Sequence, residues 1–172
     1  MSAGEDFWQF SLAVYRQPGV PNECLALQES LGADVNLVLL CAYLGARRKA
    51  LLKPEDVAAA IAASTEWHVD VVRNLRAARQ ALKPWEEGRD PTLQDGARTL
   101  RNAVKKLELD AERLEHDLLA HWSGARAFDT AASAEAAITN NIRMLLQHYA
   151  SESGDAAPLP QQIVAAALSQ AV

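Results

Sequence analysis

Four histidines are present, and their spacing decides whether this chain could hold a metal ion. A di-iron site of the ferritin type needs Glu-x-x-His pairs on two helices and two further glutamates. No Glu-x-x-His occurs in the sequence. His116 and His121 are five residues apart, which on a helix separates them by about 140°, so the two cannot share an ion by themselves. We therefore expect no metal site and no cofactor.

Nucleophilic chemistry is equally hard to place. Cys24 and Cys41 lie in apolar surroundings, have no Cys-x-x-Cys partner, and have no histidine or basic residue close by in the sequence. Thiols in such surroundings are typical of reduced packing residues. The sequence also lacks the Gly-rich and Gly-x-Ser-x-Gly motifs of nucleotide-binding proteins and hydrolases. These absences favour a protein that is not an enzyme, and no catalytic residue is predicted.

Polar side chains on apolar helices form a first candidate site. Ser11 lies in the middle of the apolar arc predicted for residues 5–17, and Asn36 interrupts the otherwise apolar run 35–44. A buried hydroxyl needs a partner, most simply the carbonyl of Phe7 one turn back. Asn36 and Tyr43 would bond to neighbouring helices in the same way. The alternative is a ligand pocket between the first and third helices, lined by Trp8, Ser11, Tyr15, Asn36, Tyr43 and Arg47.

A basic segment from Arg73 to Lys106 forms the second candidate site. It holds nine basic residues against four acidic ones, so it carries +5 while the rest of the chain carries −10. Such a segment could bind an acidic protein surface or RNA phosphates, with Trp85 as an aromatic anchor. A solvated surface that only keeps the protein soluble is the simpler interpretation. The candidate binding residues are Arg73, Arg76, Arg79, Lys83, Trp85, Arg98 and Arg101.

The elements that would position these residues are two long helices, 64–83 and 92–124. Apolar residues on the second recur in alternating steps of four and three, the signature of a helix–helix seam: Leu93, Ala97, Leu100, Val104, Leu107, Ala111, Leu114 and Leu118. The first helix offers a matching series: Ser64, His68, Val71, Leu75, Ala78 and Leu82. We therefore predict a long antiparallel helical hairpin with its tip at residues 85–91. His68 would be a hydrogen-bonded residue in or beside the seam.

The register of this hairpin bears on whether its arginines are paired internally. A hairpin that joins Leu82 to Leu93 places Arg76 and Glu112 out of register by about 13 residues, or about 20 Å of helix. Pairing of Arg76, Arg79 and Lys83 with Glu108, Glu112 and Glu115 is therefore not expected. The basic surface would then face water or an external anion.

The stretch 7–45 holds the longest apolar run and both cysteines, so we expect the core to form there, around a buried central helix at 35–44. Pro21 and Pro54 fit the first turns of helices, and Asp34 fits a helix cap. One further apolar face, residues 138–149, would close the bundle. With abundant alanine and few β-branched residues, the chain is predicted to be all-α, with about seven helices.

Parts of this sequence are similar to a known family. The block FW-x-FSL-x-VY-x-x-PGV-x-x-x-CL-x-LQ, followed by DVN-x-x-L-x-C, resembles an uncharacterised proteobacterial family, domain of unknown function 2390. The segments EWHVDVVRNLRAARQALK and ELDAERLE resemble it as well, so the resemblance covers about residues 7–118. It implies a compact domain and no catalytic residue.

The whole-chain properties complete the expectations. With 172 residues we predict a single helical domain at 1–151, a linker at 152–160 and a short helix at 161–172 that docks on the domain or binds a partner. The net charge of −5, the acidic start and the lack of a long apolar segment favour a cytoplasmic protein that does not enter membranes. We expect an interaction protein that presents the basic hairpin; the alternatives are the pocket and a homodimer formed through the first helix or the tail.

Overall fold

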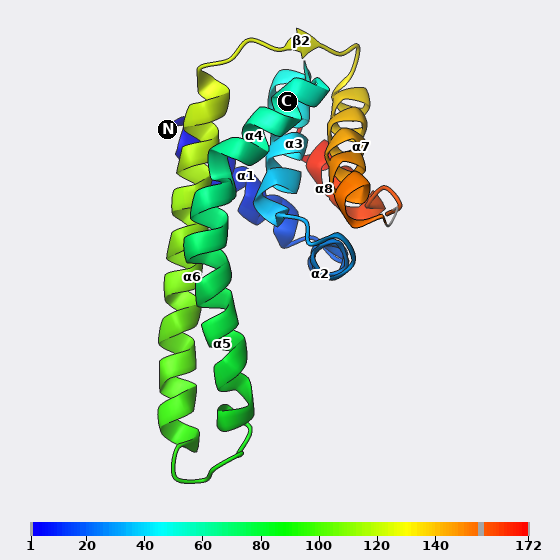
Figure 1. The fold of residues 1–172 in the computed structure, drawn as a ribbon. Coiled ribbons are helices and arrows are strands. Elements are labelled where there is room, and N and C mark those ends of the chain that lie inside the picture. The colour runs from blue at the N-terminus through cyan, green and yellow to red at the C-terminus, as the bar shows by residue number, and fades with distance from the viewer. Residues whose placement is uncertain (1, 155–156, 172) are drawn as a thin grey trace. The chain divides into compact units, whose positions relative to one another are not determined.

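The computed structural model describes residues 2–154 and 157–171, and nearly all of its regular structure is helical (Figure 1). The predicted all-α fold is thus confirmed. The contacts divide the chain into two units: residues 1–63 with 116–172, and residues 64–115.

The first unit begins with three helices whose ends follow from local sequence. Helix α1 (Ala3–Tyr15) is capped by Ser2, whose hydroxyl accepts the Glu5 N–H at 3.2 Å. Helix α2 (Val20–Leu31) ends at Gly32, whose φ of 63° is a left-handed conformation that favours glycine. Helix α3 (Val35–Arg48) starts at Asp34, whose carboxylate accepts the Asn36 N–H at 2.9 Å.

Helix α3 is buried over most of its surface and packs closely against α7 (Ala134–Ser153). The two helices approach most tightly at Gly45, where a Cβ would lie only 2.6 Å from the backbone nitrogen of Ile138. Only glycine fits there, because the obstacle is the backbone of α7 and cannot move aside. This close approach fixes the position of α7 on the core.

Two short paired strands and one buried side-chain amide fix the segments that follow α3 and precede α7. Strands β1 (Ala50–Leu51) and β2 (Asp129–Thr130) pair antiparallel. Asn141 is fully buried; its side-chain oxygen accepts the Leu52 N–H at 2.9 Å, and its amide donates to the Ala50 carbonyl at 2.8 Å. The amide therefore satisfies backbone groups that would otherwise be buried without partners.

The C-terminal helix α8 (Gln161–Ser169) packs on the first unit. Ile163 and Ala167 are fully buried, and the Glu23 carboxylate accepts the N–H groups of Gln162 and Ile163 at 3.0 and 2.9 Å. Docking on the domain was one of the two roles expected for this segment. The linker expected at 152–160 includes residues 155 and 156, and the expected terminal helix includes residue 172; these three lie outside the described residues.

The second unit is a helical hairpin. It contains the end of α4 (Pro54–Trp67), a π-helical turn η1 (His68–Val72), helix α5 (Arg73–Glu86) and most of α6 (Gln94–Gly124). In Figure 1, α5 and α6 run in opposite directions on either side of a loop. The sequence predicted that this helix ends at residue 83, before Pro84. Instead α5 continues through Pro84 to Glu86, because a proline in the last turn removes only one helical hydrogen bond.

Candidate functional site

The α6 side of the hairpin seam keeps every second predicted position and replaces each leucine between them by the residue that follows it. Ala97 and Ala111 are buried as expected, with exposures of 7% and 5%. The leucines of the predicted seam are largely exposed instead: Leu93 52%, Leu100 54%, Leu107 54%, Leu114 54% and Leu118 38%. That part of the prediction is wrong. On α6 the buried or half-buried positions alternating with Ala97, Val104 and Ala111 are polar: Arg101, Glu108 and Glu115.

Ion pairs occupy this polar seam. Arg76 donates from Nε to Glu108 Oε1 at 3.0 Å and from Nη2 to Glu112 Oε1 at 2.9 Å. Arg79 donates to both oxygens of Glu108, with its Nη2 3.2 Å from Oε1. The side chain of Glu108 is only 8% exposed, so a buried carboxylate is held by two guanidinium groups. Buried carboxylates need such partners, and the two guanidinium groups supply them here.

The expectation that these arginines are unpaired is therefore wrong, for two physical reasons. Helix α5 ends at Glu86 and α6 begins at Gln94, which moves the register toward pairing compared with a hairpin that joins Leu82 to Leu93. In addition, helical side chains point toward the N-terminus of their own helix. In an antiparallel pair, Arg76 and Glu108 lean toward each other and bridge an offset of about one helical turn.

The two carboxylates of this cluster differ electrostatically. Burial alone would raise the pKa of Glu108, but hydrogen bonds from Arg79 and Arg76 outweigh it and lower the pKa below its ordinary value. Burial raises the pKa of Glu112, since one bond from Arg76 does not offset burial and the nearby charge of Glu108. Glu108 is thus the carboxylate that the hairpin stabilises as an anion.

At the base of the hairpin, the π-helical turn places His68 against α6. His68 Nδ1 lies 3.1 Å from Oε1 of Glu115, a fully buried side chain. One turn earlier on α6, the Ala111 carbonyl accepts the indole N–H of Trp67 at 3.0 Å. The prediction that His68 is a hydrogen-bonded seam residue is confirmed.

The remaining predicted binding residues lie toward the tip. Arg101 pairs with Glu86 at 2.9 Å in a half-buried position. Lys83 and Arg98 make exposed pairs with residues three or four positions away, at 3.7 Å to Glu87 and 3.2 Å to Asp95, and such pairs contribute little to stability. Trp85 is half-buried, with the Arg89 guanidinium 4.8 Å from its ring centroid.

Within the hairpin, all of which the structure describes, four exposed cations make no ion pair: Arg73, Arg89, Lys105 and Lys106. Arg73 precedes Arg76 by three positions, and Lys105 follows Arg101 by four, so both lie on the ion-paired side of the hairpin. Lys105 and Lys106 were counted in the basic segment but were not singled out from the sequence. The sequence does not separate these lysines from the other basic residues of the segment, because the difference is that the arginines beside them are ion-paired.

The hairpin consequently has two different sides. Arg76 reaches Glu112, so the charged flanks of α5 and α6 face the same way, and we call this the charged side. On each helix the leucines lie on the flank opposite these charges, at the spacing of one heptad on α6. We call this the leucine side; it carries Leu75 and Leu82 of α5, which are half-buried, and Leu93, Leu100, Leu107 and Leu114 of α6.

The alternative pocket residues lie in the first unit, where two of them meet a histidine. Ser11 is 4% exposed, and its hydroxyl lies 3.0 Å from Nε2 of His116 instead of bonding to the Phe7 carbonyl. The rings of Trp8 and Phe7 pack against the same imidazole at centroid distances of 5.0 and 4.3 Å. Ser11 and His116 therefore form a buried polar contact between α1 and α6 that two aromatic rings enclose.

Two further pocket residues, Tyr43 and Arg47, both approach Asp6. The Tyr43 hydroxyl donates to the Asp6 carboxylate at 2.9 Å, and burial with this bond raises the pKa of Tyr43 to about 12. Arg47 donates to the Gln170 carbonyl at 2.6 Å and lies 3.9 Å from Asp6. Arg47 thereby ties α3 to the end of α8.

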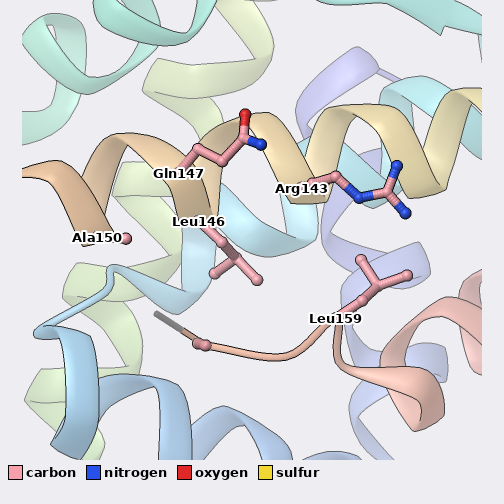
Figure 2. A pocket seen from close by; sticks show the side chains of 6 residues that line it. Arg143, Leu146, Gln147, Ala150 and Leu159 are labelled. Carbon is pink, nitrogen blue, oxygen red and sulfur yellow. The ribbon is translucent and has the colours of Figure 1, made fainter. Parts of the chain in front are cut away.

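Of the last two pocket residues, one is buried and one is exposed. Asn36 is 8% exposed at the start of α3, and Tyr15 is 45% exposed at the end of α1. A cavity of about 300 Å³ is found elsewhere in the first unit, where Figure 2 shows Leu146 of α7 and Leu159 on facing sides of it. It is lined by Arg143, Leu146, Gln147, Ala150, Ala157 and Leu159, none of which was predicted as a pocket residue.

Within the described residues, no helix is long and apolar enough to cross a membrane. A model of the family described as protein of unknown function, DUF2390, matches residues 6–119, so the resemblance inferred from the sequence is confirmed. No curated protein and no solved structure matches the chain.

Proposed function

The chain belongs to the DUF2390 family of proteins of unknown function, and from its geometry we propose that it is a non-enzymatic, cytoplasmic interaction protein. Its binding element is the charged side of the α5–α6 hairpin, and its partner is an acidic protein surface. The observation that carries this proposal is the set of exposed cations that the hairpin's own carboxylates leave unpaired.

The ion-paired arginines lie beside these unpaired cations but would not bind the partner themselves. Because Arg76 and Arg79 are held by Glu108, they are fixed in place and are not available to a partner. Arg73 and Lys105 lie on the same side and are exposed. Binding would therefore rest on Arg73 and Lys105, with Lys83 and Arg98 released from weak surface pairs when a partner carboxylate approaches.

An acidic protein fits this side better than RNA does. Glu108 and Glu112 lie among the cations, and they would repel a continuous line of phosphates. Carboxylates on a protein can be spaced to avoid them, which is how charged interfaces obtain specificity. RNA binding is the outcome that would replace this proposal.

The test is affinity capture from cell extract with the full chain at two salt concentrations, with nucleic acid retained. We expect an acidic protein that is captured at low salt and lost at high salt. An Arg73→Glu, Lys105→Glu variant should lose it. An Arg16→Glu, Arg143→Glu variant is the matched control, because it makes the same change in net charge at exposed positions of the first unit.

A reversal at Arg76 would not be a clean test, since it removes the Arg76 bonds to Glu108 and Glu112, brings a third carboxylate beside them and destabilises the hairpin. Capture of the same proteins by the Arg73→Glu, Lys105→Glu variant and by the unchanged chain would overturn the proposal. Recovery of RNA in place of protein would overturn it as well.

A further inference from the structure

The leucine side of the hairpin is an apolar surface that the described residues leave exposed. Leu93, Leu100, Leu107 and Leu114 recur at intervals of seven along α6, and each is more than half exposed. The stripe they form is about 32 Å long. Together these four side chains leave on the order of 400 Å² in water, which matches the largest apolar patch on a typical soluble monomer, a patch that is often functional.

The hairpin has little apolar material inside to compensate. Its buried apolar residues are Val72, Ala97 and Ala111, and two of these are alanines. Most of the seam consists of the ion pairs described above, which contribute less to stability than packed leucines do. Burial of the leucine side against another surface would therefore supply the apolar core that two helices alone do not have.

Charge on the hairpin points to the kind of surface that covers it. The tip half, residues 73–106, carries +5. The base half, residues 64–72 and 107–115, holds six carboxylates and one arginine, which gives −5. A second hairpin laid antiparallel to the first would bring each tip half over a base half, whereas a parallel arrangement would oppose like charges.

The leucine spacing has the symmetry that such a contact requires. The α6 stripe is centred between residues 103 and 104, so a twofold axis there would set Leu93 against Leu114 and Leu100 against Leu107 of the second copy. On the other arm of the hairpin, the apolar residues from Val71 of η1 to Leu82 of α5 are centred at 76–77. That point lies opposite 103–104 in a hairpin whose helices end at Glu86 and begin at Gln94.

We propose that two copies of this chain associate through their leucine sides into an antiparallel four-helix bundle, with α6 packed on α6 and α5 on α5. This goes beyond the proposed function, because it uses the opposite side of the hairpin and different residues. The charged sides of both copies remain outside the bundle and point away from each other. The dimer would thus present two copies of the acidic-partner site.

The first test is the mass of the full chain in solution by light scattering at about 50 µM, well above a micromolar dissociation constant. We expect twice 18.7 kDa. A Leu100→Gln, Leu107→Gln variant should raise the dissociation constant by more than about a hundredfold, because four leucines leave each symmetric contact. Leu25→Gln is the matched control, since Leu25 is equally exposed, at 52%, but lies on α2.

Circular dichroism of the same samples shows whether the helices are retained, and the Arg73→Glu, Lys105→Glu variant separates this proposal from the proposed function. That variant should lose the acidic partner and remain a dimer. A monomer at this concentration would overturn the antiparallel bundle. A dimer that the Leu100→Gln, Leu107→Gln variant leaves intact would overturn it too, because another surface would then be responsible.

The second test fixes the orientation by disulfide crosslinking. A mixture of Leu93→Cys and Leu114→Cys chains should form a mixed disulfide under mild oxidation, whereas each variant alone should not crosslink. The two natural thiols do not interfere, because Cys24 and Cys41 are buried. Crosslinking of each variant with itself would indicate parallel hairpins and overturn the arrangement.

Discussion

The two glutamates that bind Arg76 should respond in opposite ways to the loss of their charge. Glu108→Gln and Glu112→Gln each replace a carboxylate by an amide of the same shape, on the same helix and one turn apart. Glu108 accepts hydrogen bonds from two guanidinium groups, whereas Glu112 accepts one from Arg76. The contrast between the variants therefore isolates the electrostatics of the seam from its packing.

The magnitude follows from the partners that each change leaves behind. Removal of the Glu108 charge leaves Arg76 and Arg79 beside each other with no shared anion. Loss of one partner from a buried ion pair costs about 3–5 kcal/mol. Because the two arginine side chains are 21% and 24% exposed and keep some water, the lower limit applies, so we expect about 3 kcal/mol. Glu112→Gln should change stability by less than about 1 kcal/mol at pH 7 and should be neutral or stabilising.

The pKa shifts predict how the effect of each substitution on stability changes with pH. The lowered pKa of Glu108 means that its contribution is complete above the ordinary value of 4.5 and is lost as the pH falls through the lower folded value. The destabilisation in Glu108→Gln should therefore shrink below pH 4.5. The raised pKa of Glu112 means that its charge costs stability at neutral pH and stops doing so as the pH falls. Any benefit of Glu112→Gln should therefore vanish in mild acid.

Hydrogen exchange of the α5 and α6 amides is the suitable assay, because two units need not unfold together and a single melting curve would mix them. Glu108→Gln should speed exchange from the most protected hairpin amides by about a hundredfold. Glu87→Gln is the control, since its pair with Lys83 is exposed and contributes little. Equal effects of Glu108→Gln and Glu112→Gln would refute the assignment of Glu108 as the stabilised anion.

Three further predictions concern the first unit. Gly45→Ala should destabilise it by about 3 kcal/mol, since the new methyl group would meet the backbone at Ile138; a melting temperature within 2 °C of the unchanged chain would contradict this. Asn141→Ala should cost about 3 kcal/mol in urea unfolding, because buried backbone groups lose their partner, and an unchanged midpoint would show that water replaces the amide. The thiols of Cys24 and Cys41, whose pKa burial raises to about 12, should resist alkylation at pH 8 in the folded chain and react at once in urea; rapid reaction of the folded chain would mean that the core opens readily.

Much of the fold follows from local rules that the sequence carries by itself. Alanine content and periodicity predicted helices. Ser2 and Asp34 cap the N-termini of α1 and α3 with their side chains, and Gly32 ends α2 with its left-handed backbone. The apolar run at 35–44 predicted a buried helix because no face of it could be left in water. These features depend on neighbours within a few residues, so they can be read without a fold.

Ser11 and Gly45 show where that reading stops. The apolar arc around Ser11 predicted burial correctly, but its partner is His116, more than a hundred residues away in the sequence. Gly45 looks like any glycine in a helix until α7 is laid against it. In both cases the missing information is the identity of the residue on the neighbouring element.

The hairpin marks the same limit most clearly. The sequence by itself determined that two long helices run antiparallel and that leucines and charges alternate along them, because these follow from periodicity and from the loop between the helices. Only the tertiary structure decided which series faces the partner helix. A rotation of about 50° about the α6 axis exchanges Leu100 and Leu107 for Arg101 and Glu108, and that rotation depends on the hydrogen bonds that Arg76 and Arg79 make across the seam.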